Sequence, residues 1–392
     1  MPDPTLQGSF RILFLYDVCE EIRLDQLRGL VGRDLKRLPP ARPVSPEYIR
    51  FERPPLVQPL GQITVSDSTL PGGGTFSAEL NYYEYGAVSV KLEVPFSLDW
   101  PDLVALSGRW IASQPLEAAA LRLARDSVRK AGPALIRPNE EWLTEDYYII
   151  HLRNEPSPDG TYRFSGAGLI AEHGGDIAKI VRGELAELST EEQREVLNSP
   201  MSYYPHDLMV AGWNAAFLCD TDAGALPSVQ LLEYANTQLL EFRYYDTILS
   251  RVLEKVHGTL GRRGPLKRWR LAREAQGLNR LRLDIRDLTE KMDTSIKFLS
   301  DMFSARQYRM AATRIGVDDY RRLVESKLHT AGDLYTFLMD QFNTSRGFVL
   351  ELIVVIILMI ELAFFFMGRA WAGSRLKPGV FQPPTHGKKS HP

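Results

Sequence analysis

The sequence predicts an α+β protein with an N-terminal α/β sandwich head (antiparallel sheets), a long helical coiled-coil hairpin and a single C-terminal transmembrane helix. Three observations support this fold class. β-like runs separated by turn residues precede residue 228, helical spacing of apolar residues follows it, and residues 348–367 are almost entirely apolar. The predicted boundaries are 1–135 and 136–227 for two α/β units, 228–346 for the coiled coil, 347–368 for the membrane helix and 369–392 for a basic flexible tail.

The composition is that of an ordinary globular protein. Of 392 residues, 44% are hydrophobic and 24% charged, and the net charge of −2 offers no overall attraction to nucleic acid or anionic lipid. Any such attraction must therefore be local. Cys19 and Cys219 lie far apart without metal-ligand spacing, which favours two buried thiols in a reducing compartment over one disulfide.

The predicted head begins with the strand-like run FRILFLYDV, followed by an amphipathic helical pattern and a Pro-rich link. The runs GQITVSD, GTFSAELNYY and EYGAVSVKLEVPF read as strands, and helical patterns follow at 100–112 and 115–130. A second unit contains YYIIHL, a helix near 176–188 and a strand or hairpin near 207–220. We therefore expect two small α/β sandwiches.

The region after residue 228 carries three apolar stripes at helical spacing. The first two, separated by GTLGRRGPL, predict an antiparallel coiled-coil hairpin. The third stripe, 317–345, leads into the apolar run. We expect the chain either to kink at Gly316 or to bend sharply near Gly347. Such stripes indicate packing rather than chemistry.

The apolar run FVLELIVVIILMIELAFFFM is long enough to cross a bilayer at about 1.5 Å per residue. Its fifteen Leu, Ile, Val and Phe residues contribute roughly −4.5 to −9 kcal/mol to insertion, against roughly +2.5 to +3.5 for a central acid. Glu351 and Glu361 are ten residues apart, which places them within about 80° on one side of a helix. That side predicts self-association through the glutamates. Alternatively, Glu351 lies at headgroup level and Glu361 is protonated.

The flanking segments give conflicting orientations for this span. The N-terminus has no signal-peptide or presequence pattern, which predicts a cytoplasmic N-terminal region. The following tail is basic without acidic residues, which also favours the cytoplasm and leaves its side open. Its charges are Arg369, Arg375, Lys377, Lys388 and Lys389.

The strongest local charge is in GRRGPLKRWRLAR, at the predicted hairpin tip. This segment could contact RNA phosphates, with its tryptophan stacking on a base, or anionic lipid headgroups. A solvated helix start explains it equally well. The residues are Arg262, Arg263, Lys267, Arg268, Trp269, Arg270 and Arg273.

No catalytic or metal-ligand constellation rises above background in the sequence, so we expect no catalytic residue, no metal and no cofactor.

The stretch VESKLHTAGDLYTFLMDQFNTSRGFVLELIVVIILMIELAF carries two acidic dipeptides, Leu350-Glu351 and Ile360-Glu361. It resembles the C-terminal signature of the family called "required for meiotic nuclear division", whose two acidic anchors match these dipeptides, although Leu352 replaces the family's usual Trp. LLEYANTQLLEFRYYDTILSRVLEKV is similar to the upstream helix of bacterial members. The resemblance covers about 228–366 and implies a membrane-anchored protein without established enzymatic activity. Mitochondrial members assemble in several copies and support translation.

From the resemblance and the missing presequence we expect a single-pass protein of the bacterial cytoplasmic membrane. The predicted function is a non-enzymatic scaffold or adaptor that self-associates in the lipid bilayer and docks a cytoplasmic partner, such as RNA or a ribosome. An oligomeric cation or proton channel using Glu351 and Glu361 is the alternative, and an enzyme using the head is the third hypothesis.

Overall fold

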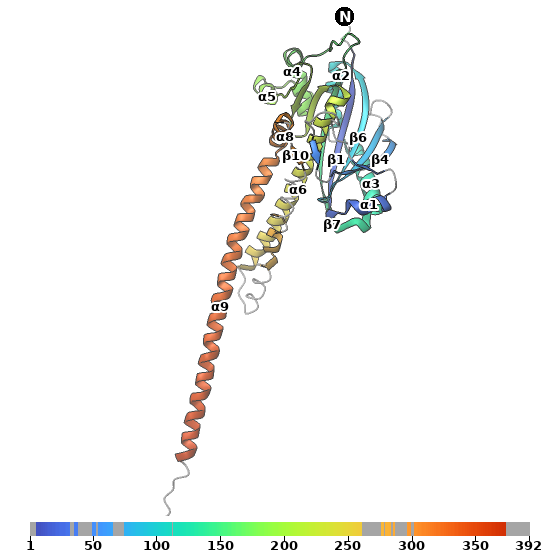
Figure 1. Cartoon of the computed structure of the whole chain (residues 1–392). Helices are drawn as coiled ribbons and strands as arrows, with labels where there is room; N and C mark the ends of the chain where they lie inside the picture. Colours follow the sequence, from blue (N-terminus) through green and yellow to red (C-terminus); the bar gives the residue numbers. More distant parts are fainter. Residues whose placement is uncertain are drawn as a thin grey trace, which may run out of the picture.

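The fold of the head is built on one large mixed sheet, with a long helix projecting away from it (Figure 1). The computed structural model describes residues 5–31, 35–37, 49–51, 54–65, 74–111, 113–260, 276–277, 279–283, 285–286, 296–298 and 302–373. Within these residues, the sheet has the order β2-β4-β5-β6-β1-β7-β9-β8. Its strands are β1 (Leu6–Ile22), β2 (Lys36–Arg37), β4 (Leu56–Thr64), β5 (Thr75–Tyr82), β6 (Ala87–Leu98), β7 (Leu135–Arg153), β8 (Leu208–Ala211) and β9 (Ala215–Asp220).

The central strands are long, and their side chains alternate between two apolar layers. β1 pairs antiparallel with both β6 and β7, while β7 pairs parallel with β9. Along β1, Phe10 and Ile12 face one core and Leu13 and Leu15 face the other, as the two-residue period of a strand requires. Both faces of the sheet are therefore covered.

The first face is covered by α2 (Trp100–Trp110), α3 (Gln114–Ala131) and α4 (Gly166–Arg182). Asp99 accepts a hydrogen bond from the Asp102 backbone N–H at 2.9 Å, and Ser165 accepts one from Gly168 at 3.1 Å, so α2 and α4 begin at capping residues. The shorter α1 (Leu24–Leu30) and α5 (Thr190–Val196) lie beside this layer, and a short 3₁₀ turn spans Gly132–Ala134.

The second face is covered by α6 (Asp222–Leu260), α8 (Met302–Ile315) and the first turns of α9 (Val317–Gly373). Gly316 joins α8 to α9 with a φ of 94°, a left-handed conformation that glycine adopts without a Cβ clash. A separate pair of short strands, β3 (Ile49–Phe51) and β10 (Ile296–Phe298), is antiparallel.

α6 and α9 run side by side in the same direction (Figure 1). Lys327 of α9 contacts Asp246 and donates to the Ser250 hydroxyl at 2.6 Å, and farther along both helices Leu338 packs near Val256. Beyond that contact, α9 extends away from the head.

The predicted architecture is wrong in two respects. The strands expected in two separate sandwiches form one mixed sheet, because β7 pairs with β1 on one edge and with β9 on the other. The second coiled-coil helix is not continuous, since residues 296–298 form β10, and α6 packs on the sheet rather than in an isolated hairpin. Heptad spacing reports an apolar stripe, which a sheet covers as well as a helix does.

The predicted transmembrane helix is also wrong, and with it the membrane location, including the cytoplasmic membrane of a bacterium. Among the residues that the structure describes, no helix carries an apolar stretch of the length that a bilayer crossing needs. Within residues 353–363 of α9, every side chain is exposed and all but Glu361 are apolar.

Candidate functional site

The interface between α6 and the sheet contains an unusual number of buried polar side chains. On α6, Glu233, Thr237 and Glu241 are spaced by four residues, so they lie on one face of the helix, and all three are buried. The sheet residues opposite include Asn81 and Asp17, which are also buried. Buried polar groups are stable only when they are paired, so each level of this face can be checked for a partner.

At two of the three levels a hydrogen bond joins α6 to the sheet side, and Asn81 Oδ1 is left without a partner among the described residues. Asn81 Nδ2 donates to Glu233 Oε1 at 2.7 Å, and the hydroxyls of Tyr85 and Thr237 form a hydrogen bond of 2.7 Å. These contacts attach α6 to β5 and to the turn that follows it. They account for polar residues in an otherwise apolar layer.

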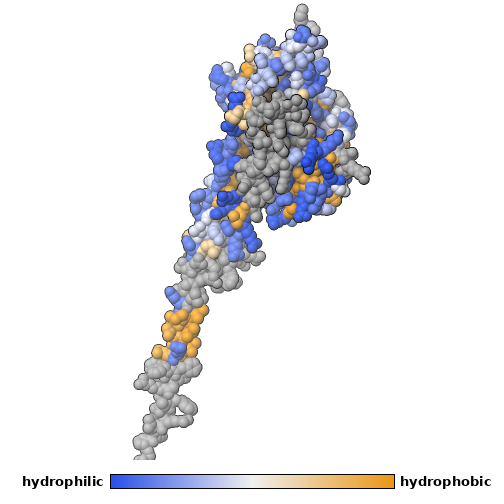
Figure 2. Space-filling view, viewed as in Figure 1, coloured by the Kyte–Doolittle hydropathy of each residue, from blue (hydrophilic) through white to orange (hydrophobic). Residues whose placement is uncertain are grey.

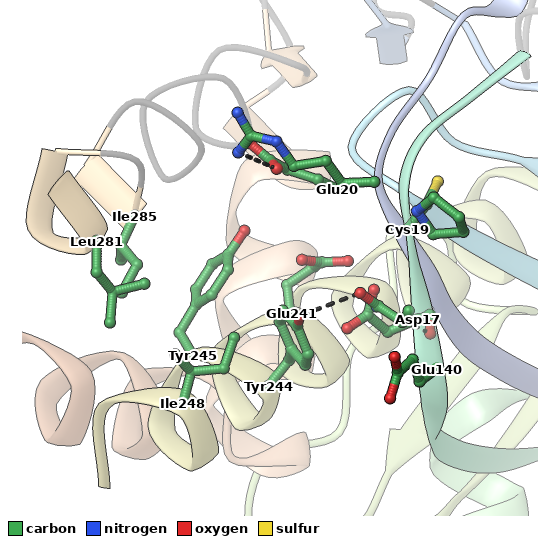
Figure 3. Close-up of a pocket in the computed structure, with 13 residues that line it drawn as sticks. Asp17, Cys19, Glu20, Glu140, Glu241, Tyr244, Tyr245, Ile248, Leu281 and Ile285 are labelled. Atoms are coloured by element: carbon green, nitrogen blue, oxygen red, sulfur yellow. Dashed lines mark hydrogen bonds and ion pairs between the residues drawn. The ribbon is translucent and has the colours of Figure 1, made fainter. Parts of the chain in front are cut away.

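The third level places two carboxyl groups against each other. Asp17 is 1% exposed and Glu241 is 2% exposed, and the two side chains point toward one another across the gap between β1 and α6 (Figure 3). The Tyr245 hydroxyl adjoins Glu241. Yet Asp17 Oδ2, Glu241 Oε1 and Tyr245 Oη make no hydrogen bond within the described residues.

Burial dominates the electrostatics of this pair. It raises the pKa of Asp17 to about 8, an effect that the neighbouring Asn139 amide partly offsets. Burial, and then the negative charge of Asp17, raise the pKa of Glu241 well above its ordinary value. At neutral pH the pair therefore retains protons that exposed carboxyls would have lost.

These side chains line a pocket of about 380 Å³ (Figure 3). Tyr244, Tyr245 and Ile248 of α6 form one wall, and Leu281 and Ile285 lie beside Tyr245 on the side away from Asp17. A pocket with few polar groups on apolar and aromatic walls has the usual character of a small-molecule site.

The pocket mouth is polar and partly neutralised. Arg137 of β7 donates to Glu20 at 2.6 Å, which pairs the basic side chain in the lining. Asn139 receives a hydrogen bond from the Tyr244 hydroxyl at 3.1 Å and donates to the Asp17 carbonyl at 3.3 Å. Glu140, also at the mouth, is exposed.

The lining includes one thiol, that of Cys19. Burial raises the pKa of the Cys19 thiol to about 12, so it stays protonated and is a poor nucleophile. No group of three or more His, Cys, Asp or Glu residues suited to a metal ion occurs within the described part of the chain.

His151 is another buried titratable residue, and its contact is one that stabilises the sheet. Its Nε2 lies 3.0 Å from the Asp220 carbonyl, so it links β7 to the end of β9. Burial, reinforced by the charge of Arg11, lowers its pKa to about 4, so the ring is neutral at pH 7. The carboxylate of Asp222 is instead bound by Arg153 at 3.0 Å.

The two glutamates predicted as site residues do not line this pocket. Glu351 and Glu361 are exposed on α9, at a distance from the head. The predicted basic tip lies outside the described residues, which applies to Arg262, Arg263, Lys267, Arg268, Trp269, Arg270 and Arg273.

Sequence reasoning missed Asp17 and Glu241, although each left a signal. Asp17 follows five consecutive apolar or aromatic residues within one strand. Glu241 sits between Leu239 and Phe242 of a buried stripe. A carboxylate within a buried pattern is informative, because acids are rarely buried without a partner.

Comparison with known proteins places the head in an uncharacterized family. The sequence model described as "Uncharacterized protein MJ0711, N-terminal domain" matches residues 7–225, more than half of the chain. Uncharacterized protein MJ0711 of Methanocaldococcus jannaschii is 21% identical over 224 residues, which are 57% of this chain and 66% of that protein. The match thus spans just under two thirds of the relative. No solved structure matches the chain.

The resemblance to the "required for meiotic nuclear division" family is therefore wrong. It rested on two Glu-containing dipeptides and helical stripes in 228–366, whereas the family match covers the head. Apolar helical spacing recurs wherever a long helix packs, so it identifies a family poorly.

Proposed function

This chain belongs to the family of the MJ0711 N-terminal domain, and we propose that it is a non-enzymatic scaffold that self-associates through α9 and docks a partner. One observation carries the self-association: eight successive large apolar side chains of α9, from Ile353 to Ile360, are exposed, and successive helical positions point to different sides. Figure 2 shows this apolar segment from one side. From Ile353, at 46% exposure, to Met359, at 67%, no position on this segment is covered within the isolated chain. A helix that is apolar on all sides is normally buried.

The energetic incentive for covering this segment is large. The residues concerned are Ile353, Val354, Val355, Ile356, Ile357, Leu358, Met359, Ile360 and Leu362. Complete burial of one large aliphatic side chain is worth about 1.5–3 kcal/mol. These side chains are about half exposed, so covering half of the exposed area would contribute on the order of 4–7 kcal/mol per chain before association costs.

A second copy is the occupant that we infer. The described elements of the same chain do not reach this segment, because the last described apolar contact of α9 with α6 is at Leu338 and Met339. Residue 353 lies about 20 Å farther along the helix axis. Other copies supply an identical apolar helix, and covering every side except the one that carries the glutamates requires more than two helices.

We assign the two glutamates to the rim of this assembly. Glu351 and Glu361 lie on one side of α9 and are exposed. Like charges brought together in register would repel, so this side faces water rather than the neighbouring helices.

The test is the mass of the full chain by light scattering during size-exclusion chromatography. We expect a species of three or more copies for the wild type, and a monomer for Ile356→Glu combined with Met359→Glu. Thr330→Glu with Thr336→Glu is the matched control, since both threonines are exposed on α9 outside the apolar segment. A monomeric wild type at tens of micromolar, or a control that dissociates equally, would reject the proposal.

For the partner, we retain the basic segment around Arg262, Arg263, Lys267 and Arg268 as a candidate contact for RNA phosphates. Salt-dependent co-sedimentation with ribosomes should be lost when these four residues are changed to Glu. Binding that persists in that variant would assign the contact elsewhere. The channel alternative depended on the predicted span, and no observation on the described residues supports it independently.

A further inference from the structure

We propose that the pocket between β1, β7 and α6 binds a small organic cation through a primary ammonium group, with Asp17 and Glu241 as its anionic partners. This inference is independent of self-association through α9. It concerns a different part of the molecule and would stand if the chain were a monomer.

Three buried polar atoms without a hydrogen bond occur in the lining of this pocket. Asp17 Oδ2, Glu241 Oε1 and Tyr245 Oη are buried and make no hydrogen bond within the described residues. A primary ammonium has three N–H donors and no acceptor, so one such group could pair with all three oxygens. Leaving each oxygen unpaired costs free energy comparable to a lost hydrogen bond, so the site favours a donor-rich guest.

The second argument is charge complementarity. Two carboxyl groups that face each other favour a cation between them, because its binding allows both groups to release their protons and offsets the repulsion between the resulting negative charges. The basic side chain in the lining, Arg137, is paired with Glu20 at 2.6 Å and is exposed at the mouth. Glu140 adds a further acidic group at the entrance. An anionic ligand would be repelled by these acidic groups.

The walls of the pocket are aromatic and aliphatic. Beyond the carboxyl pair, the lining consists of the rings of Tyr244 and Tyr245 and the aliphatic side chains of Ile248, Leu281 and Ile285 (Figure 3). Aromatic faces attract cations and aliphatic side chains accommodate a short alkyl chain. The volume of about 380 Å³ suits a molecule of a few carbon atoms.

A hard metal ion fits this lining less well. Ca²⁺ takes 6–8 oxygen ligands, and Mg²⁺ requires octahedral coordination. The buried end of the pocket offers two carboxyl groups and phenol oxygens, surrounded by apolar carbon. The described residues contain no group of metal-ligating side chains of sufficient number.

The experiment is isothermal titration calorimetry of the full chain with butylammonium and butane-1,4-diammonium. Butan-1-ol, of the same length without charge, and MgCl₂ are titrated in parallel. We expect saturable binding of an ammonium probe at one site per chain, no binding of the alcohol, and at least tenfold weaker ammonium binding in Asp17→Asn with Glu241→Gln.

Two further variants separate loss of the site from loss of the fold. Ile248→Trp fills the pocket while keeping both carboxyl groups, and it should also weaken binding at least tenfold. Glu254→Gln removes a charge from an exposed position on α6 and should bind as the wild type does. Circular dichroism establishes that each variant is folded.

Three results would overturn the proposal. They are no saturable binding of either ammonium by the wild type, unchanged binding in the Asp17/Glu241 variant, and saturable Mg²⁺ binding in place of ammonium binding. The first would leave the carboxyl pair as a buried proton-sharing pair only, and the last would assign the site to a metal ion.

Discussion

Two buried glutamates on the same face of α6, Glu233 and Glu241, meet different partners on the sheet. At Glu233, a buried carboxylate meets the Asn81 amide at 2.7 Å, and the contact attaches α6 to the sheet. At Glu241, two turns farther along α6, a buried carboxyl meets another carboxyl, that of Asp17, and the oxygens remain unpaired. Burial alone therefore does not identify a functional site. What distinguishes the second level is the missing complement, together with the pocket beside it.

The difference follows from the residue that each strand presents. β5 offers an amide donor at position 81, and β1 offers an acid at position 17, next to the point where its register with β7 shifts between Asp17 and Cys19. That irregularity interrupts the regular pairing and coincides with the pocket. Irregular positions in strands commonly accompany functional sites.

The largest expected effect comes from making the paired level resemble the unpaired one. Asn81→Asp would place an acid against Glu233 in a buried position, and we expect a loss of about 3–5 kcal/mol in the free energy of unfolding. Urea denaturation measures this loss. Asn198→Asp, at an exposed position, is the control and should change stability by less than about 0.5 kcal/mol. Equal stability of both variants would mean that the two levels do not differ as described.

A second prediction concerns pH. Because the pKa of Asp17 is raised to about 8 in the fold, the folded state holds a proton that the unfolded chain releases near pH 4. This contribution to stability is complete below pH 4 and declines as pH rises toward 8, by up to about 1.4 kcal/mol per pH unit.

Urea unfolding between pH 6.5 and 8 measures this decline, in a range above the ordinary pKa of histidine. His151, with a pKa lowered to about 4, contributes a change only below that range. Asp17→Asn should reduce the slope, and Glu254→Gln should keep it. A slope of the same size in Asp17→Asn would contradict the assignment.

The smallest expected effect comes from the same substitution, glutamate to glutamine, at two positions. It should change the free energy of unfolding in opposite directions at the two positions. Glu241→Gln removes a carboxyl from the unpaired level and should raise the free energy of unfolding at pH 8 by about 1 kcal/mol. Glu233→Gln weakens a charge-assisted bond to Asn81 and should lower it by about 1 kcal/mol. Thermal or urea unfolding of the two variants side by side is the measurement. A shift of the same sign in both would remove the distinction.

The sequence predicted local structure better than assembly. The run around Phe10–Asp17 was expected to be a strand and forms the centre of β1, and the stripe through Leu232 and Leu239 was expected to be helical and belongs to α6. Periodicity depends on side chains a few residues apart, so it is legible in the sequence. The single sheet was not predicted, since pairing of β7 with both β1 and β9 depends on residues far apart in the chain.

The apolar segment of α9 shows how a correct local observation can lead to a wrong conclusion. Its composition was read correctly from the sequence, and the helix is present. The inference that it crosses a membrane is contradicted by the described residues. Composition reports that a surface avoids water, and it does not report what covers that surface.

The sequence alone was sufficient to predict β1 and α6, because side-chain alternation in a strand and apolar periodicity in a helix are local. Only the tertiary structure decided that Asp17 would meet Glu241 while Asn81 meets Glu233, contacts that join β1 and β5 to a helix far along the chain. An isolated carboxyl group in either element would be solvated and ordinary. Packing of α6 on the sheet removes the water. The identity of the opposing side chain then determines whether the buried carboxyl group is hydrogen-bonded or left unpaired beside a pocket.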